Sequence, residues 1–233
     1  MFVGHYAVGL AAKKFAPRAS LGVLIAAPIL LDLLWPIFLL FKWEQVAVVA
    51  NPNPFLRFDF ISYPISHGLV ATIGWATLFA SIYFGVARYL AGAITIWIGV
   101  VSHWLLDYVV HRPDLPLYAG SSRLVGLGLW NHRWWTIAIE TAMFVLGVSI
   151  YLFQTKAKDK IGTLAFWPFV ILLLAAYGMV AFGPPPSANV KGIALGTLAT
   201  LLLVFYAWWF DRHRERRAAI QDSATPATKS AAG

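Results

Sequence analysis

The chain has 233 residues, of which 60% are hydrophobic and 12% charged, and its mean hydropathy of +0.70 excludes an ordinary soluble domain. It contains no cysteine, which excludes disulfides, thiolate metal sites and cysteine nucleophiles. The net charge of +8 comes from Lys and Arg scattered between apolar segments and in the tail, a distribution that indicates membrane topology rather than nucleic-acid binding.

The first apolar segment, residues 2–15, is too short to cross a bilayer alone and ends before Pro17. We expect it to form a half-helix. The N-terminus lacks the basic stretch and the small-residue cleavage site of a secretory signal, so His5 is expected to remain in the mature protein.

Six further apolar segments are each about 20 residues long, the length that an α-helix needs to cross a hydrocarbon core of about 30 Å. They cover residues 20–41, 64–87, 91–110, 134–153, 161–182 and 190–210. The pattern predicts an all-α fold, a polytopic membrane helix bundle of six transmembrane helices plus the short N-terminal half-helix. This integral membrane domain covers residues 1–212, and residues 213–233 are expected to form a basic, disordered tail.

Lys and Arg residues are distributed unevenly between the two ends of these segments. Twelve of them lie on the side that holds Lys13 and the tail, and six lie on the opposite side. The positive-inside rule therefore predicts that the tail is in the cytoplasm. We expect an integral protein of the cytoplasmic membrane, with the lipid bilayer as its partner and no binding of nucleic acid.

The segment 91–110 and the residue after it contain an H-x-x-x-D-x-x-x-H pattern, in which His103, Asp107 and His111 are spaced by four. On an α-helix this spacing brings the three side chains onto one face. An ionisable group at bilayer depth costs about 3 kcal/mol, so such a pattern needs a compensating partner. A divalent metal is the obvious candidate, and hydrogen bonding between helices is the structural alternative.

Five more ionisable residues are predicted to lie in the external half of the bundle: His5, Asp32, His67, His132 and Glu140. His67 falls three residues inside its predicted span, and a helix rising from the Lys13 turn brings His5 to mid-bilayer depth. Such a concentration favours one shared site. Structural roles are the alternatives, such as a helix cap for His67 or an ion pair for Glu140.

Two external loops, residues 42–63 and 111–131, are expected to form a lid and a vestibule over this site, because they combine turn residues with interfacial aromatic residues. Arg112, Arg123 and Arg133 lie at the predicted mouth. Arginine binds phosphate in a bidentate manner, so these three are candidates for substrate binding, with lipid headgroup contact as the alternative.

Four short motifs within residues 1–140 follow an order known from one family. They are Gly4-His5, Pro28-Ile29-Leu30-Leu31-Asp32, Ser66-His67 and Ser102-His103-x-x-x-Asp107. This order resembles the membrane-bound metal-dependent hydrolases, the YdjM-like inner-membrane proteins also described as LexA-binding, which are distantly similar to zinc-dependent phospholipase C and P1-type nucleases. The resemblance implies a bacterial inner-membrane hydrolase whose metal ligands are His5, Asp32, His67, His103 and Asp107.

The residues and the resemblance together predict a metal-dependent hydrolase that acts on a phosphoester or lipid-linked substrate from the external side of the membrane. The ligand types suit zinc first and manganese second, and the metal would activate a water molecule. Asp32 and Asp107 are the candidate catalytic residues, because a second carboxylate orients or deprotonates that water. Additional candidate ligands are His111, His132 and Glu140.

Two other functions use the same residue types. A proton- or ion-coupled membrane transporter would use the buried His, Asp and Glu side chains as a relay. A haem protein would place paired histidines on facing helices, but haem disfavours several carboxylates around its iron. The metal content of the purified protein distinguishes the hydrolase from the transporter.

Overall fold

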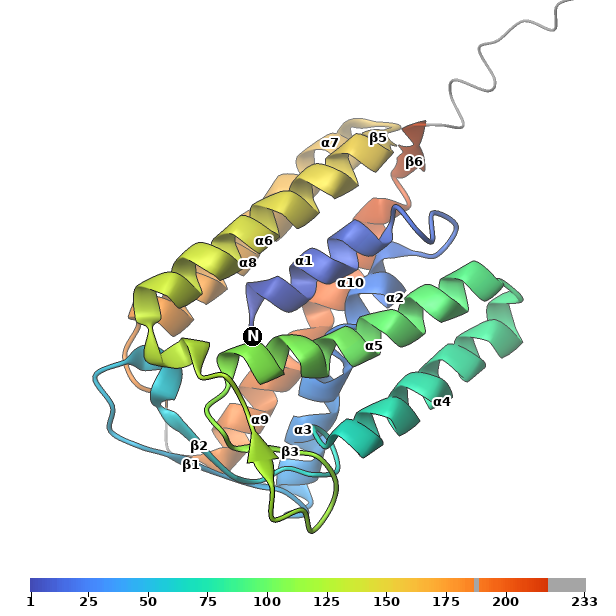
Figure 1. Ribbon diagram of the computed structural model, residues 1–233. Coiled ribbons are helices and arrows are strands. Elements are labelled where there is room, and N and C mark those ends of the chain that lie inside the picture. The colour runs from blue at the N-terminus through green and yellow to red at the C-terminus, as the bar shows by residue number, and fades with distance from the viewer. Residues whose placement is uncertain (187–188, 218–233) are drawn as a thin grey trace, which may run out of the picture.

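The computed structural model describes residues 1–186 and 189–217 and consists mainly of α-helices (Figure 1). The ten α-helices of this described part are α1 (Val3–Ala12), α2 (Leu21–Ala26), α3 (Leu30–Leu40), α4 (Leu69–Ala87), α5 (Leu90–Val110), α6 (Arg133–Gln154), α7 (Lys160–Leu164), α8 (Phe166–Phe182), α9 (Val190–Leu198) and α10 (Leu201–Asp211). Two short 3-10 helices, η1 (Pro54–Leu56) and η2 (Leu129–Asn131), lie in the loops.

Five helical segments of the described chain are long and apolar enough to cross a membrane: α4, α5, α6, the α7–α8 pair and the α9–α10 pair. The prediction of a bundle of helices with the length and composition of membrane spans is confirmed, but the prediction of six spans is not. The difference lies in residues 20–41, which are divided into α2 and α3. Pro28 lies at the break, where it lacks the amide hydrogen that would continue the helix.

The short helix α1 matches the predicted half-helix and packs against α6, α2 and α5 (Figure 1). Two glycines allow this close packing. A Cβ at Gly147 of α6 would lie 2.5 Å from the carbonyl oxygen of Ala7, and a Cβ at Gly9 would lie 2.7 Å from the Cα of Ile25 in α2. Because α1 is held between its neighbours in this way, His5 lies inside the bundle.

The structure differs from the all-α prediction because it contains short antiparallel strand pairs. In the loop of residues 42–63 β1 (Gln45–Val48) pairs with β2 (Phe58–Ser62), and in the loop of residues 111–131 β3 (Leu115–Pro116) pairs with β4 (Leu124–Val125). The sequence Phe58-Asp59-Phe60 alternates apolar and polar residues, which is the pattern of a strand. Both pairs lie at the same end of the bundle (Figure 1).

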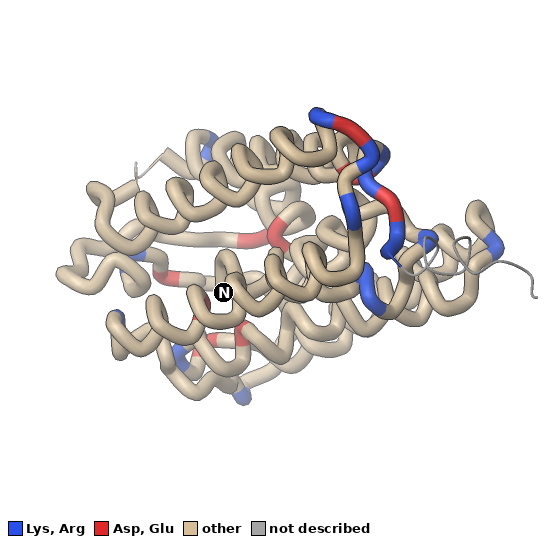
Figure 2. Tube along the Cα trace, turned by 90° about the horizontal axis from the view of Figure 1, so that it is seen from above, with Lys and Arg blue, Asp and Glu red and all other residues tan. Residues whose placement is uncertain are grey.

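The opposite end of the bundle holds β5 (Thr155–Ala157), which pairs with β6 (Arg214–Arg216). The expected disorder of the tail therefore does not apply to β6, because Arg214 donates to the carbonyl oxygen of Gly162 at 2.6 Å and fixes the strand. The rest of the predicted disordered tail, residues 218–233, lies outside the described residues. Figure 2 shows most Lys and Arg near the ends of the bundle and acidic positions near the N-terminus in its interior.

Candidate metal centre

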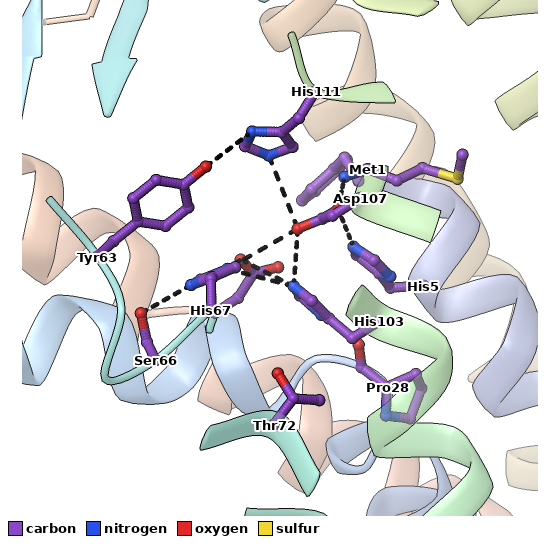
Figure 3. A network of polar contacts seen from close by, with 12 residues as sticks. Met1, His5, Pro28, Tyr63, Ser66, His67, Thr72, His103, Asp107 and His111 are labelled. Carbon is purple, nitrogen blue, oxygen red and sulfur yellow. Dashed lines mark hydrogen bonds and ion pairs between the residues drawn. The ribbon is translucent and has the colours of Figure 1, made fainter. Parts of the chain in front are cut away.

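The C-terminal part of α5 presents ionisable side chains on one face, as their four-residue spacing predicts. They meet side chains from α1, from the first turn of α3 and from the turn before α4 (Figure 3). We call this set the His–Asp cluster: His5, Asp32, His67, His103, Asp107 and His111. All except Asp32 are buried.

His103 is oriented by a backbone carbonyl group. Its Nδ1 lies 2.7 Å from the carbonyl oxygen of Pro28, at the break between α2 and α3. A carbonyl oxygen only accepts hydrogen bonds, so Nδ1 of His103 carries a hydrogen and donates it. The Nε2 atom of the neutral ring therefore offers a lone pair to the His–Asp cluster.

His67 lies in the turn before α4 and not three residues inside the span, because the helix begins only after Gly68. Glu44 fixes this turn by accepting the backbone N–H groups of Ile65 at 2.8 Å and of Ser66 at 2.7 Å. The Ser66 hydroxyl donates to Glu44 at 2.6 Å, so it accepts the Nδ1–H of His67 at 2.7 Å. The Nε2 atom of the neutral His67 ring therefore offers its lone pair to the His–Asp cluster.

His111 is oriented by a carboxylate from the loop after α5. Its Nδ1 lies 2.9 Å from Oδ1 of Asp114, which also accepts the hydroxyl hydrogen of Tyr63 at 3.1 Å. Burial opposes ionisation of Asp114, but the hydrogen bonds from His111, Tyr63 and Arg112 outweigh it and hold the pKa of this carboxyl below its ordinary value. Burial raises the pKa of the Tyr63 hydroxyl, which keeps it a donor. Asp114 therefore accepts the Nδ1–H of His111.

The Nε2 atoms of these three imidazoles all face Oδ2 of Asp107. The distances are 3.0 Å from His103, 3.7 Å from His111 and 3.8 Å from His67. If the rings are neutral, three lone pairs face an acceptor oxygen. If all three are protonated, three positive charges lie together in a buried region. A cation between the nitrogens and the carboxylate removes both difficulties, because every one of these atoms can then donate a lone pair to it.

His5 approaches the same carboxylate from α1. Its Nε2 lies 3.1 Å from Oδ1 of Asp107, and its ring stacks on that of His103 with centroids 3.9 Å apart. The amine of Met1 donates to the same Oδ1 atom at 2.5 Å. Four imidazoles and one amine therefore lie around the carboxylate of Asp107 (Figure 3).

Asp32 lies in the first turn of α3, where the helix dipole favours a carboxylate. Its Oδ1 lies 3.6 Å from Nε2 of His67 and 3.9 Å from Nε2 of His103. Two trios have ligand atoms within 4.8 Å of one another: His5, His103 and Asp107, and Asp32, His67 and His103. Two nitrogens bound to one tetrahedral zinc ion lie about 3.3 Å apart. The Nε2 atoms of His67 and His103 are 3.3 Å apart, which is the spacing of two ligands of such an ion.

A cavity of about 620 Å³ reaches the His–Asp cluster. Its polar lining includes Asp32, His67, Asp107, His111 and Glu140. Its apolar lining comes from the loop of residues 42–63 and from α3, α8 and α9, and includes Trp35, Phe55, Phe58, Phe60, Val180 and Ile193. The cluster thus adjoins a space large enough for a small molecule, since ligand pockets commonly measure about 300–1,000 Å³.

Two of the additional candidate ligands are not part of the cluster. Glu140 is buried beside it, where Oε2 accepts the backbone N–H groups of Phe2 at 2.8 Å and Gly4 at 3.4 Å at the start of α1. His132 is exposed immediately before α6. The third candidate, His111, belongs to the cluster as described above.

The three arginines predicted to bind substrate do not line the cavity of the described residues. Arg112 pairs with Asp59 at 2.8 Å, in the strand β2. Arg133 lies over the ring of Trp134, and Arg123 is exposed. The structure thus places all three in the loop of residues 111–131 or at the start of α6, apart from the cluster.

Sequence reasoning missed two acids that orient the candidate ligands, Glu44 and Asp114. Asp114 follows His111 by three residues, a spacing that suits a contact within one turn and is visible in the sequence. Glu44 precedes Ser66 by 22 positions, and no local pattern connects the two.

Comparisons with known proteins give no match to this chain: no protein-family model, no curated protein and no solved structure matches it.

Proposed function

We propose that this protein is a membrane-embedded metal-dependent hydrolase that acts on a phosphoester. One observation carries the proposal: three imidazoles, each donating its Nδ1–H to an oxygen, direct Nε2 at the carboxylate of Asp107. Proteins orient metal-binding histidines in this way, with an outer hydrogen bond that fixes the tautomer and the ring. The same arrangement has no comparable purpose in a bundle held together only by packing.

The metal would be held by His67, His103 and Asp107, with His5 and His111 beside them. Imidazole and carboxylate ligands suit zinc first and manganese second. When bound, such an ion lowers the pKa of a coordinated water toward about 7 and polarises a phosphoryl oxygen.

The two carboxylates of the cluster have different surroundings, which supports different roles. The side chain of Asp107 is 3% exposed and surrounded by imidazoles, so we assign it to metal binding. The side chain of Asp32 is 38% exposed and lines the cavity, so we assign it as the base that takes a proton from water. The water oxygen then bonds to phosphorus, the bond from phosphorus to the leaving oxygen breaks, and that oxygen takes up a proton.

We also propose that the site opens toward the external side of the cytoplasmic membrane. Lys13 pairs with Asp211 at 2.6 Å, which supports the assignment of the Lys13 turn and the tail to one side. The helix α5 begins beside Arg88 at that end, and His103 and Asp107 lie in its later turns. The positive-inside rule then predicts that the basic end of the bundle lies on the cytoplasmic side of the membrane.

Metal analysis of the purified protein tests the proposal. We expect about one or more equivalents of zinc or manganese in the wild-type protein and loss of that metal in His103→Ala, because His103 belongs to both candidate trios. The matched control is His132→Ala, because this histidine is exposed and outside the cluster. It should retain the wild-type metal content.

Folded wild-type protein that binds neither metal when supplied with it would contradict the proposal. If such metal-free protein carried protons across liposome membranes under a pH gradient, and His103→Ala abolished that flux, the cluster would be the relay of a transporter. Retention of full metal content in His103→Ala would also overturn the ligand assignment.

A further inference from the structure

The cavity beside the His–Asp cluster has one polar end and one long apolar wall. Its apolar wall lies between two membrane-spanning segments and includes Ala176 and Val180 of α8 and Ile193 and Gly196 of α9. A ligand that fills the whole cavity therefore has a polar part near the cluster and a hydrocarbon part between α8 and α9. This is the form of a membrane lipid.

The apolar part of the cavity reaches the outer surface of the bundle. Val180 lines the cavity and is 42% exposed, and Gly192 and Gly196 line it and are exposed. These residues belong to helices with the length and composition of membrane spans. When these helices cross a bilayer, an opening beside Val180 and Gly196 faces the lipid chains, so a lipid chain can enter sideways.

Four buried polar atoms of cavity-lining residues have no hydrogen-bond partner among the described residues. They are the hydroxyl oxygen of Tyr6, Nε1 of Trp35, Nε1 of Trp130 and Oε1 of Glu140. Trp35 is 6% exposed and Glu140 is 1% exposed, and leaving such groups unpaired costs about 1–3 kcal/mol each. The two indole N–H groups require acceptor oxygens, and the carboxylate oxygen requires a donor such as a hydroxyl.

We propose that the substrate is a membrane lipid phosphoester with a hydroxyl-bearing headgroup, whose hydrocarbon chain lies between α8 and α9 and whose phosphate lies beside the His–Asp cluster. The indole N–H groups of Trp35 and Trp130 donate to headgroup oxygens, and Glu140 accepts from a hydroxyl. The cleavage of this lipid rests on the proposed hydrolase function, but its binding does not.

Gly196 offers a way to fill the lipid path without disturbing the fold. A Cβ at this position would meet no described atom within 4 Å and Gly196 lines the cavity, so a phenylalanine there fits without a clash and occupies space at the cavity wall. Gly178 of α8 is the matched control, because a Cβ there also meets no described atom within 4 Å and the residue does not line the cavity.

Photo-crosslinking in lipid nanodiscs tests the proposal. The probe is a phosphatidylglycerol with a diazirine in one acyl chain, and the matched probe is a diacylglycerol with the same chain but no phosphate. We expect the first probe to label residues 176–180 and 192–200. Labelling should fall about tenfold or more in Gly196→Phe and stay unchanged in Gly178→Phe. Trp35→Phe, which removes one donor but keeps a ring, should reduce the preference for the phosphate-bearing probe.

Three results would overturn the lipid site. In the first, the two probes label the cavity equally and Gly196→Phe has no effect, so the contact is only that of surrounding bilayer lipid. In the second, phosphatidylglycerol does not label the cavity. In the third, Gly196→Phe separates a dimer in native mass spectrometry and leaves labelling unchanged, so the glycine face binds a second copy of the chain.

The outcomes also separate the lipid site from the hydrolase proposal. A protein that binds no metal but shows phosphate-dependent cavity labelling has the lipid site without the hydrolase activity. A protein that binds zinc and cleaves water-soluble bis(p-nitrophenyl) phosphate equally in wild type and Gly196→Phe, without cavity labelling, has the activity without the lipid site.

Discussion

At the scale of single residues, the Ser66 hydroxyl controls the orientation of one candidate ligand. It donates to Glu44 at 2.6 Å and accepts from Nδ1 of His67 at 2.7 Å, and this fixes both the tautomer and the direction of the ring. Without the hydroxyl the ring has more freedom, and freezing it upon metal binding costs entropy. Ser66 thus acts on a candidate ligand without being a candidate ligand itself.

We expect Ser66→Ala to weaken metal binding about 10–100-fold, the usual effect of removing an outer hydrogen-bond partner. Competition with a chelator of known affinity measures the change. Ser102→Ala is the matched control, because the Ser102 hydroxyl bonds only to the carbonyl oxygen of Gly99 in its own helix among the described contacts. Equal affinities of Ser66→Ala and wild type would show that His67 is not a ligand.

At the scale of the elements, α1 reaches the cluster because glycine lets it pack closely against α6. A Cβ at Gly147 would lie 2.5 Å from the backbone oxygen of Ala7, and backbone atoms cannot move aside as a flexible side chain does. The position of α1 in turn places His5 beside Asp107. Helix packing and ligand geometry are therefore coupled.

Gly147→Leu is expected to displace α1, to lower the thermal unfolding midpoint of the purified protein and to reduce its metal content. Overpacking of this kind costs about 1–3 kcal/mol or more. Gly85→Leu in α4 serves as the comparison, since a Cβ there meets no described atom within 4 Å. If the two variants had equal midpoints and metal contents, close packing of α1 would not be needed for the site.

A second element, the strand pair β5–β6, is joined to α7 by Asp159. This carboxylate accepts the N–H of Gly162 at 2.9 Å and lies 2.7 Å from Nδ1 of His213. The hydrogen bond with His213, followed by that from Gly162, holds the pKa of Asp159 below its ordinary value of 3.8. Because the folded-state pKa is lowered, the stabilisation is present above that ordinary value and is lost as the pH falls through the folded-state pKa.

We therefore expect protection of the Gly162 amide against hydrogen exchange, corrected for intrinsic rates, to decrease as the pH falls below about 4. The variant Asp159→Asn still accepts from Gly162 but does not titrate, so it should lack this decrease. The same pH profile in both proteins would mean that another group controls the opening of α7.

At the scale of the whole molecule, Asp211 joins segments from both halves of the chain. Its Oδ2 accepts from Lys13 at 2.6 Å and from the backbone N–H of Leu21 at 2.9 Å, and its Oδ1 accepts from Tyr151 at 2.8 Å. These contacts connect α10 to the end of α1, the start of α2 and α6 at the basic end of the bundle. Asp211 thus ties these four segments together at the basic end of the bundle.

Asp211→Ala is expected to destabilise the protein by about 3–5 kcal/mol, because it leaves the Lys13 ammonium without its buried partner. The thermal unfolding midpoint measures this loss. The fraction that stays folded should keep the wild-type metal content, since Asp211 does not contact the cluster within the described structure. Loss of metal from folded Asp211→Ala would show that the two ends of the bundle are coupled.

Part of this architecture follows from the sequence alone. The apolar composition and the 20-residue segments predicted a helical membrane bundle, and four-residue spacing predicted that His103 and Asp107 of α5 lie on the same side as His111, which directly follows the helix. Both predictions rest on periodicity and length, which are local properties of the chain. The break at Pro28 between α2 and α3 was not predicted, although the proline that explains it was visible.

Only the tertiary structure decided which groups orient the ligands and what adjoins them. Glu44 reaches Ser66 from 22 positions away, His103 bonds to Pro28 from 75 positions away, and residues of α8 and α9 line the same cavity. Such contacts depend on how helices pack against one another, and packing is set by the shapes of all the facing side chains together. Local spacing determines which face of a helix a residue occupies, but it carries no information about what that face meets.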